Sequence, residues 1–153
     1  MATEPLTLDD ITLPALLRHA RYTYGGAMRR ALAEAGYDDI PGNGLYVIGA
    51  LALGEAPLGE IIRDLRVSKQ AGGQLVDALV LRGYLERQID AGDRRKLTVT
   101  LTERGRAAFE TQSAAREAVD AQLAARVGEK RIRQAKEVLD ALIDIGHGGR
   151  DED

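Results

Sequence analysis

Several residue types that carry specialised chemistry are missing or scarce in this chain of 153 residues. It has no cysteine and no tryptophan, one phenylalanine and five tyrosines. The lack of cysteine excludes disulfides, zinc–thiolate sites and thiol catalysis, and it is compatible with a reducing compartment. Hydrophobic residues make up 44% of the chain but aromatic residues only 4%. The core must therefore be built from Leu, Ile, Val and Ala, as in many helix-rich proteins.

Long hydrophobic runs are also absent. No segment approaches the roughly 20 apolar residues that cross a bilayer, and no basic stretch leads into an apolar run at the N-terminus. We therefore expect a soluble, cytoplasmic protein with no membrane partner. A length of 153 residues further predicts one compact folding unit with a single core.

Catalytic and cofactor-binding patterns are missing as well. His19 and His147 are far apart, and no HExxH motif or paired-ligand spacing occurs. The glycines of "GNGLYVIG" lack the spacing of a nucleotide-binding loop. Asp38 and Asp39 fall in a loop, where solvated carboxylates are ordinary. The sequence therefore predicts that the protein is not an enzyme and has neither a metal site nor a cofactor.

The apolar pattern predicts a chain that is mainly helical. Spacings of three and four residues indicate helices, with Ser68 as a cap and Gly36 and Gly83 as stops. The expected helices cover residues 13–35, 45–53, 58–67, 69–82 and 103–145, the last with a break near Gly128. Residues 147–153 are expected to be a disordered tail.

Between the fourth and fifth helices, the period changes from three-to-four to two. "YLERQI" (84–89) and "LTVTLT" (97–102) are typical of two antiparallel strands, with Thr98 and Thr100 on one face of the second. The loop between them carries three consecutive cations. Although the net charge is −3, residues 63–106 hold ten Lys and Arg against six Asp and Glu. A locally basic segment inside an acidic chain favours contact with a polyanion over a merely solvated loop.

This order of elements is that of a winged helix-turn-helix, in which one helix enters the DNA major groove and a hairpin contacts the neighbouring backbone. "DLRVSKQAGGQLVDALVLRGYLER" followed by "DAGDRRKLTVTLTERGRAAFE" resembles the winged-helix core of the MarR (multiple-antibiotic-resistance regulator) family of bacterial transcription factors. The likeness covers about residues 45–109. It implies one domain over 1–153 that is mainly α with a small β-hairpin wing. Helices at about 8–36 and 110–146 would serve dimerisation.

The resemblance assigns DNA-binding roles to two groups of residues. In the wing, it implies that Asp93 helps to hold the loop, that one arginine of the pair Arg94 and Arg95 enters the minor groove and that Lys96 is a candidate phosphate contact. On the recognition helix, the candidates are Ser68, Lys69, Gln70, Gly73 and Gln74.

The recognition helix departs from the family pattern at the pair Gly72–Gly73, and two interpretations remain open. The glycines bring the helix backbone close to DNA, so that Gln70 and Gln74 read adenine edges. Alternatively, this helix reads sequence poorly, and affinity depends on phosphate contacts.

We thus expect a homodimeric, sequence-specific DNA-binding regulator, most simply a repressor on a pseudo-palindromic double-stranded operator. The alternatives are a winged-helix module that binds protein and a weakly specific DNA-binding protein. The resemblance also implies release by a small aromatic or phenolic effector. The candidate pocket residues for that effector are Tyr22, Tyr24, Met28, Tyr37 and Tyr46, with the alternative that these residues, at helical spacing, belong to the core.

Overall fold

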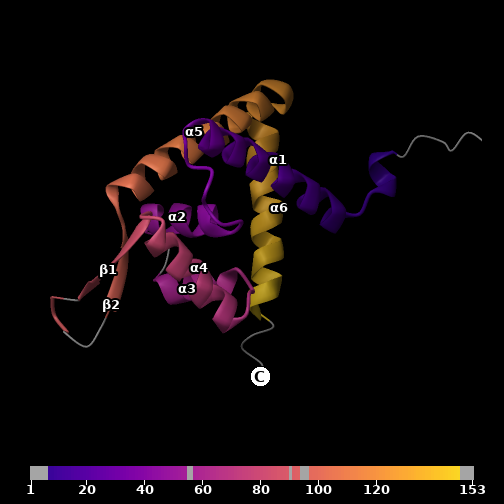
Figure 1. The fold of residues 1–153 in the computed structure, drawn as a ribbon. Helices are drawn as coiled ribbons and strands as arrows, with labels where there is room; N and C mark the ends of the chain where they lie inside the picture. The colour runs from indigo at the N-terminus through magenta and orange to yellow at the C-terminus, as the bar shows by residue number, and fades with distance from the viewer. Residues whose placement is uncertain (1–6, 55–56, 90, 94–96, 149–153) are drawn as a thin grey trace, which may run out of the picture. The chain divides into compact units, whose positions relative to one another are not determined.

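The computed structural model of the chain describes residues 7–54, 57–89, 91–93 and 97–148. Its elements, drawn in Figure 1, are η1 (Leu8–Asp10), α1 (Leu13–Glu34), α2 (Gly44–Leu53), α3 (Leu58–Asp64), α4 (Lys69–Leu81), β1 (Leu85–Ile89), β2 (Leu97–Leu101), α5 (Glu103–Val127) and α6 (Glu129–Gly148). The mainly helical class and the single hairpin predicted from the sequence are confirmed.

Two glycines end helices in the way that the sequence predicted. Gly83 has a φ of 78° and Gly128 a φ of 82°. This left-handed backbone conformation is one that residues with a Cβ rarely adopt. Gly83 ends α4 and turns the chain into β1. Gly128 separates α5 from α6. The short 3₁₀ helix η1 was not predicted; its first turn is held by Asp10, which accepts hydrogen bonds from the backbone and side chain of Thr7.

The chain divides into two compact units, residues 1–116 and 117–153. The first unit is built around α2. Leu45, Val47 and Ile48 of this helix are almost completely buried, together with Leu32 of α1 and Leu79 of α4. Each such side chain contributes roughly 1.5–3 kcal/mol through burial. This single core fixes α1, α4 and the hairpin relative to one another within the unit.

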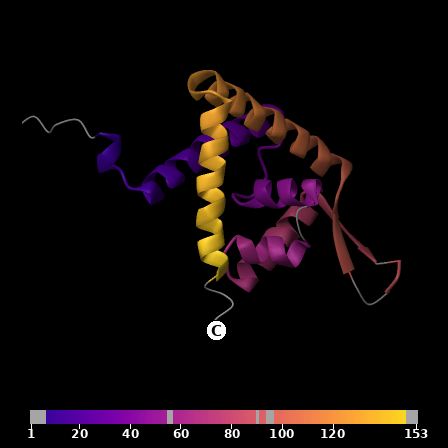
Figure 2. The same cartoon turned by 180° about the vertical axis from the view of Figure 1, so that it is seen from behind.

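The hairpin is anchored in that core at its base and projects from it at its other end. Leu85 pairs with Leu101, and the register runs to the pair Ile89 and Leu97. Leu85 and Leu101 are buried, whereas Ile89 is 66% exposed. Figure 1 and the reverse view in Figure 2 place the hairpin at one end of this unit and the start of α1 at the other. The described ends of the two strands that flank the loop therefore lie away from the buried base of the hairpin.

The second unit contains the end of α5 and all of α6. Apolar side chains of α6 are 37–75% exposed, and these are Val138, Leu139, Leu142, Ile143 and Ile145. These side chains therefore leave apolar surface exposed on α6, and the expectation of one domain over residues 1–153 stays a prediction.

The end of α6 also differs from the expected tail. The helix continues through Gly148, so His147 and Gly148 are helical, whereas residues 149–153 lie outside the described residues. Of the helices that the structure describes, none combines the length and the apolar character that a membrane span requires.

Candidate nucleic-acid interface

The helix-turn-helix is formed by α3 and α4, and its turn is built from local interactions. Arg66 has a left-handed φ of 54° and reverses the chain after α3. Ser68 then caps α4, because its Oγ accepts a hydrogen bond from the backbone nitrogen of Ala71 at 3.1 Å. A serine cap contributes about 1 kcal/mol to helix stability. The turn and the cap together set the direction of α4.

One face of α4 is buried and the opposite face is open to solvent. Val76 and Leu79 point into the core. The DNA-contact candidates on this helix are all exposed: Ser68, Lys69, Gln70, Gly73 and Gln74. The structure therefore brings all of these residues to one polar surface, which we call the α4 face.

The two glycines of α4 have different environments, which the sequence did not separate. Gly72 is buried, and a Cβ added to it would lie 2.3 Å from Cγ2 of Ile62 on α3. Gly73 is exposed, and a Cβ there would meet nothing within 4 Å. Gly72 therefore permits the close approach of α3 and α4. Because Gly72 is buried, the interpretation in which glycine lets the helix backbone approach DNA applies to Gly73 alone.

An acidic residue continues the α4 face, and the hairpin neutralises it. Asp77 lies one turn beyond Gly73, and its carboxylate forms an ion pair with the guanidinium of Arg87 on β1. The two side chains are 67% and 43% exposed, respectively. Without Arg87, a negative charge would stand on a surface proposed to meet DNA. Sequence reasoning missed this pair, since nothing local relates a residue of α4 to one on the following strand.

The wing tip is only partly described. Gly92 and Asp93 are exposed in the loop after β1, whereas Arg94, Arg95 and Lys96 lie outside the described residues. The register of the described strands places Gly92 and Asp93 beyond the end of the hairpin opposite the buried pair Leu85 and Leu101. The roles assigned to the loop remain predictions.

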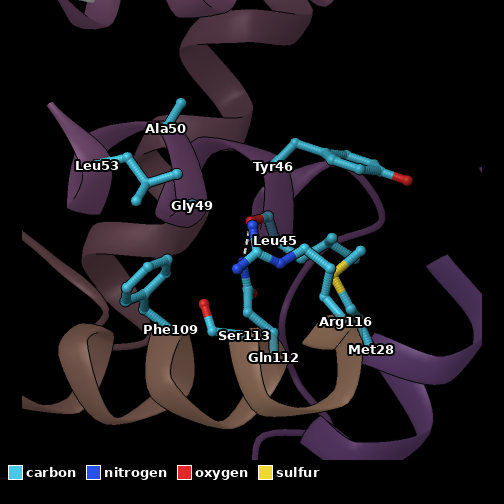
Figure 3. A pocket seen from close by; sticks show the side chains of 10 residues that line it. All are labelled: Met28, Leu45, Tyr46, Gly49, Ala50, Leu53, Phe109, Gln112, Ser113 and Arg116. Carbon is cyan, nitrogen blue, oxygen red and sulfur yellow. Dashed lines mark hydrogen bonds between the residues drawn. The ribbon is translucent and has the colours of Figure 1, made fainter. Parts of the chain in front are cut away.

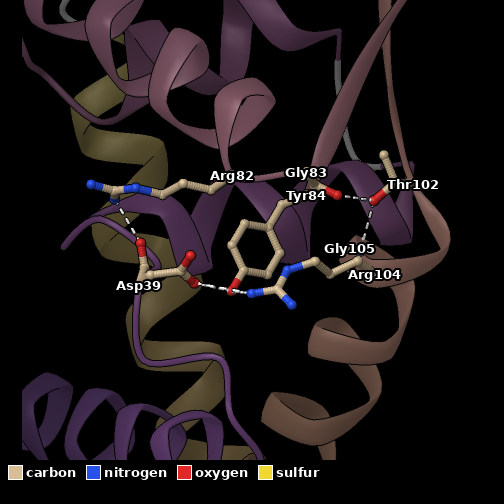
Figure 4. A network of polar contacts seen from close by, with 7 residues as sticks. All are labelled: Asp39, Arg82, Gly83, Tyr84, Thr102, Arg104 and Gly105. Carbon is tan, nitrogen blue, oxygen red and sulfur yellow. Dashed lines mark hydrogen bonds and ion pairs between the residues drawn. The ribbon is translucent and has the colours of Figure 1, made fainter.

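A polar cluster holds the base of the wing (Figure 4). The hydroxyl of Tyr84 donates a hydrogen bond to Oδ1 of Asp39, and Nη2 of Arg104 lies 3.3 Å from the same oxygen and 3.0 Å from the Tyr84 hydroxyl. The backbone oxygen of Asp39 accepts a hydrogen bond of 2.6 Å from Arg82. The Arg104 guanidinium also lies over the Tyr84 ring, 4.6 Å from its centroid. Asp39 is thus a structural anchor rather than the solvated loop carboxylate that was expected.

The protonation properties of this cluster follow from its contacts. The hydrogen bond from Tyr84 lowers the pKa of the Asp39 carboxyl below its usual value, and the charge of Arg104 acts in the same direction. Burial, followed by the hydrogen bond to Asp39, raises the pKa of Tyr84 to about 12. At neutral pH, the cluster therefore contains a carboxylate, a neutral phenol and a guanidinium.

The start of α5 is fixed against the same strand. Oγ1 of Thr102 donates a hydrogen bond to the Gly83 carbonyl and accepts one from the Gly105 nitrogen at 3.0 Å. A Cβ on Gly105 would lie 2.2 Å from the carbonyl oxygen of Tyr84, so this close approach requires glycine. The end of α4, the base of the wing and the start of α5 are consequently joined by short-range contacts.

An apolar cavity of about 260 Å³ lies between α2 and α5 (Figure 3). Met28 and Tyr46, two of the predicted pocket residues, line it. Gln112 is buried in its wall, where its side-chain nitrogen donates a hydrogen bond of 2.8 Å to the Leu45 carbonyl. Its Oε1 atom is buried without a partner among the described residues. The cavity thus combines a largely apolar lining with the buried acceptor of Gln112 and the polar side chains of Ser113 and Arg116; we call it the α2–α5 cavity.

The other predicted pocket residues do not join this cavity. Tyr22 lines a separate cavity, which it shares with Tyr46. Tyr37 packs edge-on against Tyr84 with ring centroids 6.2 Å apart, and Tyr24 packs against the core. The five residues therefore do not form one pocket.

Comparisons with known proteins agree with this architecture. Residues 38–96 match the sequence model described as MarR family. The S. aureus MepR–DNA complex is similar in structure at 19% identity, with a TM-score of 0.68 over 88% of this chain and 98% of the other. The apo form of E. coli MarR is similar at 20% identity, with a TM-score of 0.62 over 86% of this chain and 96% of the other. No curated protein sequence matches the chain. Within the described part of the chain, no cluster of His, Cys, Asp and Glu suits a metal ion.

Proposed function

We propose that the chain, whose residues 38–96 match the MarR family model, is a DNA-binding transcriptional regulator rather than an enzyme, and that it acts as a homodimeric repressor on a pseudo-palindromic operator. This role requires access to the chromosome and therefore a cytoplasmic location.

The observation that carries the proposal is the α4 face. It combines a lysine, two glutamines and an exposed glycine on a helix whose other side is fixed in the core. Glutamine pairs with the adenine edge through two hydrogen bonds in the major groove, and lysine contacts phosphate. The hairpin beside α4 would carry Arg94 and Arg95 to the flanking backbone. The structural neighbour MepR was crystallised in a complex with DNA, which supports DNA binding by the fold of this chain.

The exposed apolar side chains of α6 support dimerisation. A second copy of the chain would cover them and gain roughly 25 cal/mol for each Å² of apolar surface buried. A two-fold axis would also present two α4 faces to successive major grooves about 34 Å apart, which is the reason for expecting a pseudo-palindrome. The protein should therefore sediment as a dimer of about 33 kDa, twice the 16.5 kDa of one chain.

Release by a small molecule would use the α2–α5 cavity. Its apolar lining and the unpartnered Oε1 of Gln112 suit a small aromatic or phenolic molecule whose hydroxyl donates a hydrogen bond. Residues of α2, the central helix of the core, line this cavity. A bound ligand would therefore contact the helix against which α4 packs. If the ligand binds the DNA-free conformation more tightly than the DNA-bound one, its binding releases the protein from DNA.

Fluorescence anisotropy with DNA that flanks the protein's own coding region tests the proposal. Gln74→Ala should lower affinity for the preferred site by roughly 1–3 kcal/mol and leave binding to scrambled DNA nearly unchanged. Glu117→Gln, an exposed position outside the α4 face, serves as the control. Equal reductions in affinity for both DNAs would reject base reading by Gln74. Absence of binding to any DNA would favour a protein-binding module instead.

A further inference from the structure

Among the described residues other than glycine, Arg66 alone has a positive φ, and it lies in the turn between α3 and α4. A residue with a Cβ adopts this left-handed conformation at a cost, which glycine avoids and asparagine reduces. A smaller residue would therefore form the same turn more easily. The turn alone does not account for an arginine at this position, and a strained residue of this kind points to a role for its side chain.

The described fold makes no use of the Arg66 guanidinium. Arg66 is exposed, and no hydrogen bond or ion pair joins its side chain to another described residue. Asp64, the nearest acidic residue in the sequence, is also exposed and forms no ion pair with a described cation. The backbone nitrogen of Arg66 donates a hydrogen bond of 3.0 Å to the Arg63 carbonyl, which almost any residue could do. The strain at Arg66 is thus not offset by a side-chain contact within the described chain.

The neighbours of Arg66 show on which side of the turn its side chain lies. Leu65 packs against the core, and Val67 is half-buried, with its Cγ2 atom 3.9 Å from the position of a Cβ added to Gly72. Between these two inward-facing residues, Arg66 is exposed, as is Ser68, the cap of α4. Arg66 therefore lies beside the N-terminal end of the α4 face, with its guanidinium open to solvent.

DNA binding by the α4 face would bring this guanidinium to the edge of the major groove. In a helix-turn-helix, the N-terminal residues of the second helix contact base edges. The major groove is about 12 Å wide, and phosphates line both of its edges, so a long side chain that begins two residues before the cap stands next to the DNA backbone. A guanidinium forms paired, charge-assisted hydrogen bonds with a phosphate. On the basis of the proposed DNA-binding function, we propose that Arg66 is a phosphate-contact residue, kept in a strained turn for this contact.

Fluorescence anisotropy of the full-length protein at several salt concentrations tests this role, on DNA that flanks the coding region and on scrambled DNA. Arg66→Asn removes the charge and suits the left-handed turn, whereas Arg66→Lys keeps the charge. Arg66→Asn should weaken binding to both DNAs by roughly tenfold, the effect of losing one charge-assisted hydrogen bond. It should also flatten the dependence of log K on log salt by roughly 0.9, the value for one phosphate contact. Arg66→Lys should keep most of this slope.

Arg106→Gln is the charge-matched control, because Arg106 is an exposed arginine of α5 outside the α4 face and the wing loop. It should bind both DNAs as wild type does, with the same salt dependence. An equal loss of affinity in Arg106→Gln and Arg66→Asn would show that net charge alone accounts for the effect, and it would overturn the proposal.

Urea unfolding separates a DNA contact from a structural role of Arg66. Because Arg66→Asn relieves strain in the turn, its urea midpoint should equal or exceed that of wild type although it binds DNA more weakly. A lower midpoint, an unchanged salt slope or a loss confined to the preferred DNA would each overturn the phosphate contact. These results reject the role of Arg66 alone if wild type binds DNA. A wild type that binds neither DNA would reject the proposed function together with this role.

Discussion

Adding one methyl group should stabilise the protein at Gly73 but not at Gly72, although the two positions are adjacent in α4. In a helix interior, Ala is more favourable than Gly by about 0.8–1.0 kcal/mol. At Gly73 nothing lies within 4 Å of the added Cβ, so Gly73→Ala should gain this amount. At Gly72 the Cβ would lie 2.3 Å from Cγ2 of Ile62, and one of the two helices must move. Overpacking of this kind costs about 1–3 kcal/mol.

The two effects at Gly72 oppose each other, so Gly72→Ala should change stability by between roughly zero and a loss of 2 kcal/mol. The difference between the two variants should thus be about 1–3 kcal/mol in the free energy of unfolding. Urea unfolding followed by circular dichroism measures it, with all proteins at one concentration because a dimer's stability depends on concentration. Equal stabilisation by both substitutions would refute the close approach of α3 and α4 at Gly72.

Two further predictions concern polar contacts around the wing. Tyr84→Phe removes the hydrogen bond that lowers the pKa of Asp39 in the folded protein. Because a lowered pKa stabilises the folded state above the usual value of 3.8, the variant should be less stable than wild type above pH 3.8. The difference in the free energy of unfolding should shrink as pH falls through the folded pKa of Asp39, and urea unfolding at several pH values measures it. A difference that does not change with pH would contradict the assigned cause. Arg87→Ala should weaken DNA binding, because it leaves the negative charge of Asp77 without its partner on the α4 face. Adding Asp77→Ala to this variant should restore the affinity for DNA in anisotropy measurements. A double variant that binds DNA as weakly as Arg87→Ala alone would show that the ion pair does not affect DNA binding.

The Gly73→Ala variant also separates the two interpretations of the α4 face. If the helix backbone lies against base pairs at Gly73, the added methyl group lowers affinity for the preferred site while the protein itself becomes more stable. If affinity depends on phosphate contacts alone, the variant binds DNA as wild type does. Anisotropy on preferred and scrambled DNA distinguishes these outcomes, with Gly26→Ala as a control because its Cβ also meets nothing within 4 Å.

The elements that sequence reasoning located well are those with local signals. The cap at Ser68, the stop at Gly83 and the break at Gly128 each depend on one residue and its own backbone. The hairpin was likewise visible because its apolar period of two differs from that of the helices on either side.

The contacts that were missed connect distant parts of the chain. Asp39 meets Tyr84 and Arg104 across 45 and 65 residues, and nothing in the sequence near Asp39 indicates either partner. The burial of Gly72 depends in the same way on Ile62 of another helix. Period and propensity predict which residues face inward, but they do not predict which inward-facing residues meet.

The central claim is that the α4 face and the wing bind double-stranded DNA. The most direct test measures the dissociation constant at several salt concentrations for wild type and for Arg94→Ala/Arg95→Ala, on DNA that flanks the coding region. We predict saturable binding by wild type. For the variant, we predict weaker binding, and the dependence of log K on log salt should be flatter by roughly 0.9 for each phosphate that the removed arginines had neutralised. An unchanged slope would contradict the role of the wing, and no preference of the wild type for this DNA over a scrambled sequence would contradict a sequence-specific regulator.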